Sequence, residues 1–149
     1  MALQENIDQD IKSAMLSKDS ARLRGLRAIK AALLVAKTEK GAAEIITEDT
    51  EIRVLQKLVK QRKESAEIYH AQKRDDLYQI ELEEMQVIET YLPKQMTRED
   101  ITAHVKDAIQ RSGAKDIKEM GKVMGLVNKE LAGKADGKTI SEVVKELLA

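Results

Sequence analysis

The stretch Tyr91-Leu-Pro-Lys-Gln-Met-Thr-Arg-Glu-Asp100 contains the only proline of the 149-residue chain and divides the chain into two parts. Proline lacks a backbone N–H and disfavours helical geometry at the preceding residue, so a helix that reaches Leu92 has to end there. The four residues from Thr97 to Asp100 are typical of a helix start, and we expect a new helix to open at this point. The sequence therefore predicts an N-terminal domain, residues 1–92, and a C-terminal domain, residues 93–149.

The spacing of apolar residues predicts helices on both sides of the proline. Apolar side chains recur every three or four residues in seven segments, and no segment shows a convincing strand-like alternation. We expect the second segment to break near Gly41, because glycine is a poor helix former. We therefore predict an all-α fold, with an N-terminal four-helix unit followed by a C-terminal three-helix unit. The predicted helices cover approximately residues 3–15, 20–36, 48–70, 77–92, 98–112, 117–131 and 140–148.

Short polar residues mark the expected helix starts. Asp19 or Ser20 is placed to cap the second helix, and Thr47 to cap the third. The segments Asp116–Glu119 and Thr139–Glu142 each combine a capping residue with a glutamate three positions later. This is the pattern of a capping box, so we expect one at the start of each of the last two helices.

The composition excludes several kinds of chemistry. The chain has no cysteine, which rules out disulfides, thiolate metal sites and cysteine nucleophiles. Its two histidines, His70 and His104, lie in different predicted helices and lack the spacing of a metal-binding motif. No serine lies in a G-x-S-x-G sequence. We therefore predict a non-catalytic protein, with no metal and no cofactor.

The apolar and aromatic content limits the expected location and partners. No apolar run approaches the roughly 18–20 residues that span a bilayer, and the acidic start of the chain lacks a signal-peptide pattern. We therefore expect a cytoplasmic protein with no membrane partner. Three tyrosines are the only aromatic side chains, too few for a protein that binds single-stranded nucleic acid by base stacking.

The charge distribution favours the C-terminal part as the site of a polyanion partner. Lysine and arginine together number 26, as do aspartate and glutamate, so the formal net charge is zero. Residues 1–92 contain 15 basic and 17 acidic side chains, whereas residues 93–149 contain 11 basic and 9 acidic ones. The C-terminal part is therefore the more basic of the two.

Four of the seven glycines and four lysines lie between Gly121 and Thr139. A glycine inside a helix costs about 1 kcal/mol relative to alanine, so its presence usually has a packing or functional reason. Gly121 and Gly125 lie four residues apart on one helix face. We expect them to allow close helix–helix packing, while the close approach of a ligand backbone is the alternative.

The segment from Gly133 to Thr139 superficially resembles a phosphate loop but does not match the motif. Three residues separate its two glycines instead of four, and the preceding segment is a predicted helix instead of a strand. We expect Gly133 to end a helix and Asp136-Gly137 to form a turn before the last helix. The start of that helix, beside Lys134 and Lys138, remains able to hold a backbone phosphate.

Two further groups of basic residues have alternative interpretations. Lys118, Lys122 and Lys129 are four and seven residues apart, so they share a helix face that contacts either solvent or a ligand. The basic run from residue 57 to residue 63 contains Arg62, which lies nearer the apolar stripe than its neighbours do. For this run we favour a structural ion-pair network over RNA contact, and its candidate partners are Glu81, Glu84 and Glu89.

Three segments taken together are similar to one protein family. They are Gln56-Lys-Leu-Val-Lys-Gln-Arg-Lys-Glu-Ser65, Tyr91-Leu-Pro-Lys-Gln95, and Glu119-Met-Gly-Lys-Val-Met-Gly125 followed by Gly133-Lys-Ala-Asp-Gly-Lys138. In this order and spacing they resemble the GatB/YqeY family in its short, stand-alone YqeY-like form. The resemblance extends over essentially the whole chain.

This resemblance implies a fold and a partner. In the larger family members the unit is the helical tail of the GatB component of the glutamine-dependent aspartyl/glutamyl-tRNA amidotransferase, where it contacts tRNA near its elbow. The amide-forming chemistry belongs to a separate catalytic domain, and this chain is too short to contain it. The resemblance thus makes the C-terminal lysines candidate contacts to structured RNA, which proteins read by shape and backbone.

We therefore predict a non-catalytic helical module that binds structured RNA, in particular tRNA, or that associates with an amidotransferase or aminoacyl-tRNA synthetase complex. A protein-interaction module without direct RNA contact is the alternative, which the zero net charge favours. The family label adds a carbon–nitrogen ligase with glutamine as amido-N-donor. The candidate nucleic-acid-binding residues are Lys118, Lys122, Gly125, Lys129, Gly133, Lys134, Gly137 and Lys138.

Overall fold

The computed structural model describes residues 2–39 and 46–149, and over these ranges it confirms an all-α protein. The described residues form seven α-helices and one short 3-10 helix, with no strand among them. The chain forms two compact units, Met1–Leu92 and Pro93–Ala149, called unit 1 and unit 2 below. The predicted helix break near Gly41 lies outside the described residues.

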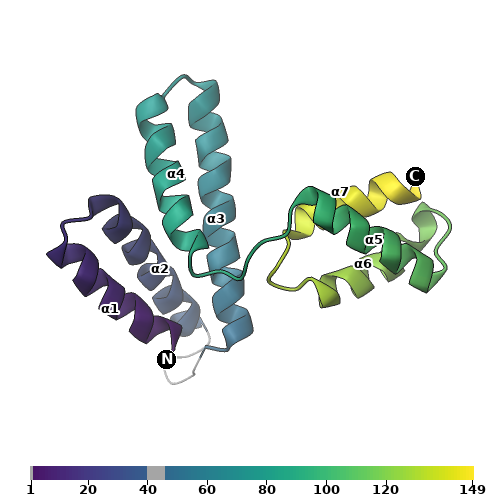
Figure 1. The fold of residues 1–149 in the computed structure, drawn as a ribbon, viewed down its shortest axis with the longest axis horizontal. Helices are drawn as coiled ribbons and strands as arrows, with labels where there is room; N and C mark the ends of the chain where they lie inside the picture. The colour runs from purple at the N-terminus through teal and green to yellow at the C-terminus, as the bar shows by residue number, and fades with distance from the viewer. Residues whose placement is uncertain (1, 40–45) are drawn as a thin grey trace. The chain divides into compact units, whose positions relative to one another are not determined.

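Unit 1 consists of two antiparallel helical hairpins (Figure 1). The first pairs α1 (Leu3–Leu16) with α2 (Ser20–Glu39), and the second pairs α3 (Glu48–Ala71) with α4 (Asp75–Glu89). Helix α2 packs against α4 and so joins the hairpins. The large side chains that are fully buried in this unit are Ile7, Leu26, Ile29, Leu33, Leu55 and Ile88.

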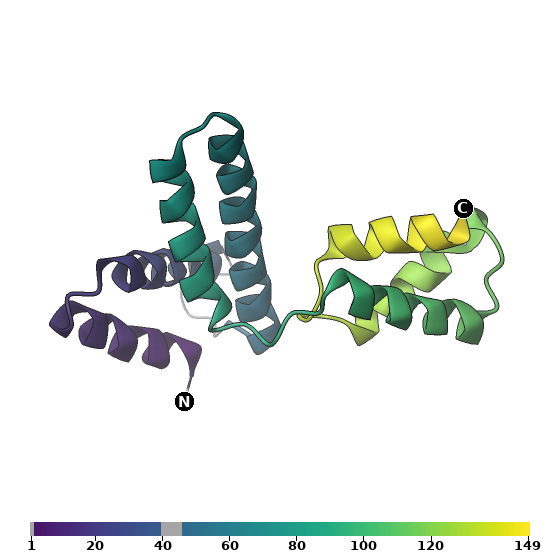
Figure 2. The same cartoon turned by 45° about the horizontal axis from the view of Figure 1, so that its top comes forward.

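Unit 2 is a three-helix bundle in which each helix packs against the other two (Figure 2). Its helices are α5 (Arg98–Ser112), α6 (Met120–Glu130) and α7 (Gly137–Leu148), and the 3-10 helix η1 (Ile117–Glu119) precedes α6. Small and branched apolar side chains fill the centre of the bundle. Those that are buried most completely are Ile101, Val105, Ala108, Val123, Val127, Ile140, Val143 and Val144.

Three of the predicted helix starts are confirmed by their hydrogen bonds. The Thr47 hydroxyl accepts a bond from the backbone N–H three residues later, at 3.2 Å. Thr97 and Asp100 form a complete capping box, with side chain-to-backbone bonds of 3.2 and 3.3 Å. Asp19 accepts a bond of 3.2 Å from a backbone N–H in the first turn of α2.

The two predicted capping boxes, at Asp116–Glu119 and Thr139–Glu142, are wrong. Asp116 caps η1 instead of an α-helix, and Glu119 accepts a bond from the backbone N–H of Lys115. Helix α7 begins at Gly137, so Thr139 lies inside its first turn. An N-cap residue needs an extended backbone, and here that conformation belongs to Asp136, with φ −75° and ψ 130°.

A close helix–helix approach occurs at a different glycine from those predicted. A Cβ built on the buried Gly25 of α2 would lie 2.7 Å from both Cβ and Cγ1 of Val87 on α4. By contrast, a Cβ on Gly121 or Gly125 would have no neighbour within 4 Å in the described part of the chain, and both residues are exposed. The close-packing interpretation of the α6 glycines is therefore wrong, because they lie away from the buried face of their helix.

The predicted ion-pair network exists and is centred on Glu84. The Nε atom of Arg62 lies 3.4 Å from a carboxylate oxygen of Glu84, and Nε of Arg24 lies 3.8 Å from the other. Both Nε atoms are buried and make no hydrogen bond within the described residues. The other two candidate partners, Glu81 and Glu89, form no ion pair there. One carboxylate thus compensates charge from both α2 and α3.

The contact at Gly25 predicts that added bulk will destabilise unit 1. Overpacking a rigid site costs roughly 1–3 kcal/mol. The Cβ of Val87 is fixed by the backbone of α4, and its branched side chain has few other rotamers in a helix. We expect Gly25→Ala to lower the free energy of unfolding by about that amount in urea denaturation. The matched control Gly125→Ala should leave it unchanged or raise it by up to about 1 kcal/mol, from helix propensity alone. Equal effects of the two substitutions would contradict this account.

Removing the shared carboxylate should also destabilise unit 1. The substitution Glu84→Gln leaves two partly buried guanidinium groups without their common counter-charge, so we expect a loss of roughly 1–3 kcal/mol. Its control is Glu83→Gln, which removes the more exposed carboxylate that lies 2.8 Å from Arg24. We expect that change to cost less than about 1 kcal/mol. A larger loss for Glu83→Gln in chemical denaturation would show that Glu84 is not the centre of the network.

Candidate nucleic-acid interface

The exposed face of α6 carries part of the predicted site. Lys122, Gly125 and Lys129 are all exposed, whereas Val123 and Val127 are buried in the bundle. With no side chain at Gly121 or Gly125, the backbone of α6 is open to solvent over two successive turns. A ligand can therefore approach this backbone closely between the lysines. This is the ligand-approach alternative that the sequence left open.

Lys118 lies outside the regular helix. It is exposed in η1, where its backbone N–H donates to the Asp116 carboxylate at 2.9 Å. The Nζ of Lys122 donates to the carbonyl oxygen of Ser112, the last residue of α5, at 3.0 Å. That bond holds one lysine near the end of α5 without neutralising its charge.

The connection between α6 and α7 presents the remaining candidates. Gly133 adopts a left-handed conformation, with φ 78°, and its carbonyl oxygen accepts a bond from the side-chain amide of Gln95 at 2.8 Å. The carbonyl oxygen of Lys134 accepts from the backbone N–H of Met96, also at 2.8 Å. The segment before α5 therefore holds this connection by two hydrogen bonds, while the Lys134 side chain stays exposed.

The start of α7 adds a cation and free helix N–H groups. Gly137 and Lys138 are the first two residues of α7, and both are exposed. Among the residues that the structure describes, no side chain caps this helix start. Unsatisfied N–H groups and the positive end of the helix dipole favour an anion at such a position.

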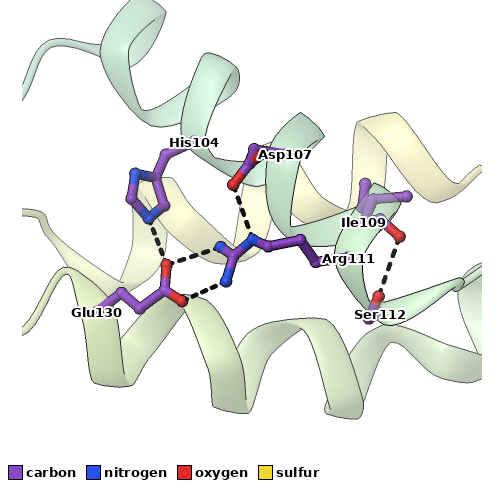
Figure 3. Close-up of polar contacts among 6 residues, drawn as sticks. All are labelled: His104, Asp107, Ile109, Arg111, Ser112 and Glu130. Atoms are coloured by element: carbon purple, nitrogen blue, oxygen red, sulfur yellow. Dashed lines mark hydrogen bonds and ion pairs between the residues drawn. The ribbon is translucent and has the colours of Figure 1, made fainter.

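Several carboxylates on the helices of unit 2 are engaged by arginine. Glu130 of α6 accepts bonds from both terminal nitrogens of Arg111, at 2.7 and 2.9 Å, and lies 2.5 Å from Nε2 of His104 (Figure 3). Arg111 also donates to Asp107 at 2.8 Å. These contacts tie α5 to α6 and remove Glu130 as a partner for the α6 lysines.

Arg98 links α5 to α7 through ion pairs of the same kind. It lies 3.1 Å from Glu142 and 2.7 Å from Glu146, both on α7. Four of the candidate lysines form no ion pair and no side-chain hydrogen bond within the described residues. These are Lys118, Lys129, Lys134 and Lys138. The arginines of unit 2 are thus neutralised internally, and its exposed positive charge comes from lysine.

Sequence reasoning missed the role of Gln95. The residue belongs to the segment Tyr91–Gln95. This segment carries part of the family resemblance, but its sequence predicted no structural role for Gln95. Its amide donates to the carbonyl oxygens of both Pro93 and Gly133, so it joins two of the signature segments. The only sequence signal for this contact is that both segments occur together in the pattern typical of the family.

Within the described ranges, no group of three or more His, Asp or Glu side chains is placed to hold a metal ion. Across those same residues, none of the helices has the length and apolar character required to cross a membrane.

The fold and this surface define a small all-helical protein with an exposed basic face on its second unit. A family model described as Yqey-like protein matches residues 4–148, so the chain belongs to the YqeY-like family. This match confirms the resemblance drawn from the three sequence segments.

Several curated relatives have the name "Altered inheritance of mitochondria protein 41, mitochondrial". The Pyrenophora tritici-repentis protein is 31% identical over 146 residues, which cover 95% of this chain and 78% of the relative. The Kluyveromyces lactis protein is 31% identical over 145 residues, with coverages of 93% and 72%. The Clavispora lusitaniae protein is 36% identical over 91 residues, covering 61% and 52%.

The comparison contradicts the predicted cytoplasmic location. The relatives are mitochondrial proteins by name, so that prediction is wrong. It rested on the lack of an apolar run and of a secretory pattern. Neither property distinguishes the cytoplasm from the interior of an organelle, which is why the inference failed.

The Glu130 cluster predicts acid sensitivity in unit 2. Hydrogen bonds from Arg111, and then from His104, lower the pKa of Glu130 from 4.5 to about 2. Because the folded-state pKa is lowered, this stabilisation is complete above pH 4.5 and is lost as the pH falls toward 2. We expect Glu130→Gln to flatten the decline of the thermal midpoint over that range. The exposed Glu99→Gln is the control, and a Glu130→Gln profile parallel to wild type would contradict the prediction.

Proposed function

We propose that this protein is a non-catalytic docking module that binds the phosphate backbone of structured RNA, with tRNA as the favoured ligand. The observation that supports the proposal is the set of lysines without carboxylate partners around the exposed backbone of α6. Lysine contacts to phosphate provide affinity without base specificity. The family resemblance supports the same partner, because it implies a relation to the tail of the GatB component of the amidotransferase.

The proposed contact surface consists of two adjoining parts of unit 2. Lys118, Lys122 and Lys129 offer cations beside the two open glycines, where a sugar–phosphate backbone can approach the helix. Lys134 and Lys138 flank the uncapped start of α7, which favours a phosphate. Double-helical RNA suits such a surface, because proteins recognise it by its shape and its phosphates.

The proposal predicts a salt-dependent loss of binding on charge reversal. We expect the triple variant Lys118→Glu, Lys122→Glu, Lys134→Glu to weaken tRNA binding at least roughly tenfold. The slope of log K against log salt should flatten by about 1 for each lysine–phosphate pair that the substitutions remove. Filter binding or fluorescence anisotropy across a salt series measures both quantities. Because the relatives are mitochondrial by name, mitochondrial tRNA should be tested beside total tRNA.

The control variant reverses three exposed lysines elsewhere, Lys12→Glu, Lys106→Glu and Lys145→Glu, none of which forms an ion pair among the described residues. It changes the net charge equally and should retain most of the affinity. Thermal unfolding of each variant checks its fold. Unchanged affinity and salt slope in the triple variant of Lys118, Lys122 and Lys134 would exclude this surface as the RNA contact.

A second candidate function is a protein-interaction module within a complex that contains a tRNA enzyme. The zero net charge of the chain favours it, as do exposed large apolar residues on α2, among them Leu34 and Val35. A complex that survives nuclease treatment and about 0.5 M salt would support this candidate, because such salt screens surface charges. Glutamine-dependent amidation of mischarged tRNA by the purified chain would instead establish the ligase alternative.

A further inference from the structure

The basic run of α3 separates into two kinds of residue in the folded protein. Arg62 points toward α4 and forms an ion pair with Glu84. Lys57, Lys60 and Lys63 are exposed instead, and none of them forms an ion pair or a side-chain hydrogen bond among the described residues. The structural network therefore accounts for only one residue of this run.

These lysines extend a basic stripe that begins one turn earlier. Arg53 is also exposed and unpaired among the described residues, and it lies four and seven residues before Lys57 and Lys60. This spacing puts the three side chains on one face of α3. The buried Leu55 and Leu58 lie on the opposite face, toward the core. The α3 stripe, defined as Arg53, Lys57, Lys60 and Lys63, thus points away from the core of unit 1.

Three cations on α2 form ion pairs, unlike those of the α3 stripe. Arg22 lies 3.6 Å from Asp10, Lys30 lies 2.8 Å from Asp8, and Arg24 is paired with α4. Unit 1 has more acidic than basic residues. The cations of the α3 stripe nevertheless have no carboxylate partner among the described residues. Acidic residues occur on α3 only before Arg53 and after Lys63, so they bound the stripe at both ends.

We propose that the α3 stripe is a second phosphate-binding surface for RNA, separate from the surface on unit 2. The stripe spans about ten residues of helix, or about 15 Å at roughly 1.5 Å per residue, which is long enough to meet several phosphates of a duplex. Lysine is a flexible point charge that suits phosphate contacts without base recognition. This inference rests on the proposed function for the nature of the ligand, but it uses none of the residues of unit 2.

Nucleic acid fits the α3 stripe better than an anionic membrane does. A helix that binds the membrane interface inserts an apolar face beside its basic residues. The apolar face of α3 is packed inside unit 1, and the segment from Arg53 to Lys63 exposes no large apolar side chain. The stripe therefore offers charge without the hydrophobic contact that lipid binding requires.

The test compares two double variants with equal changes in net charge. Lys57→Glu with Lys60→Glu alters the α3 stripe, and Lys12→Glu with Lys106→Glu is the control. All four lysines are exposed and unpaired within the described residues, so both proteins should keep the wild-type thermal midpoint. We expect the α3 variant to bind a tRNA transcript roughly tenfold more weakly at low salt. Its salt slope should fall by about 1 for each lysine, whereas the control stays near wild type.

The outcomes separate this inference from the proposed function. If the α3 variant binds like wild type while the Lys118, Lys122, Lys134 variant is impaired, the inference is wrong and the proposed function stands. Loss of binding in the α3 variant alone would support the inference and assign the main RNA surface to unit 1. A wild-type chain that binds no tRNA overturns both. The inference also fails if the α3 substitutions abolish binding to phosphatidylglycerol vesicles but leave tRNA binding intact.

Discussion

The carboxylate of Glu130 accepts hydrogen bonds from two nitrogens of Arg111 and contacts His104, and through these bonds it joins α5 to α6. Glu84 has the corresponding role in unit 1, where it forms ion pairs with Arg24 of α2 and Arg62 of α3. In both units, arginine pairs with most of the carboxylates that link two helices, and the pair of Lys30 with Asp8 is an exception. The planar, multidentate head group of arginine suits such sites better than the single ammonium of lysine. This division leaves most lysines exposed and uncompensated, although the whole chain is formally neutral.

A zero net charge therefore does not describe the surface that a partner meets. The proposed RNA surface on unit 2 combines free lysines with an open helix backbone at Gly121 and Gly125, whereas the α3 stripe has lysines and one arginine on a continuous helix. Both suit a ligand recognised through its phosphates instead of its bases. Binding is the activity that we propose for both surfaces.

The chain belongs to the YqeY-like family, and the proposed binding function draws on the resemblance of this family to the GatB tail. The resemblance to the GatB tail concerns a part of the amidotransferase that contacts tRNA, while the amide chemistry belongs to another domain. The mitochondrial names of the relatives contradict the expected cytoplasmic location. That expectation rested on composition, which does not encode the compartment of a helical protein.

The sequence by itself determined the all-α class, the approximate positions of most helices and the caps at Thr47 and Thr97, since these depend on periodicity and on contacts within one turn. It also indicated that Arg62 pairs with α4. Only the tertiary structure decided that Gly25, and not Gly121 or Gly125, allows a close helix approach, and that Gln95 anchors the turn at Gly133. Glycine lowers helix propensity equally on a buried or an exposed face, so its local cost does not reveal what lies opposite. That information arises only when segments distant in sequence pack together.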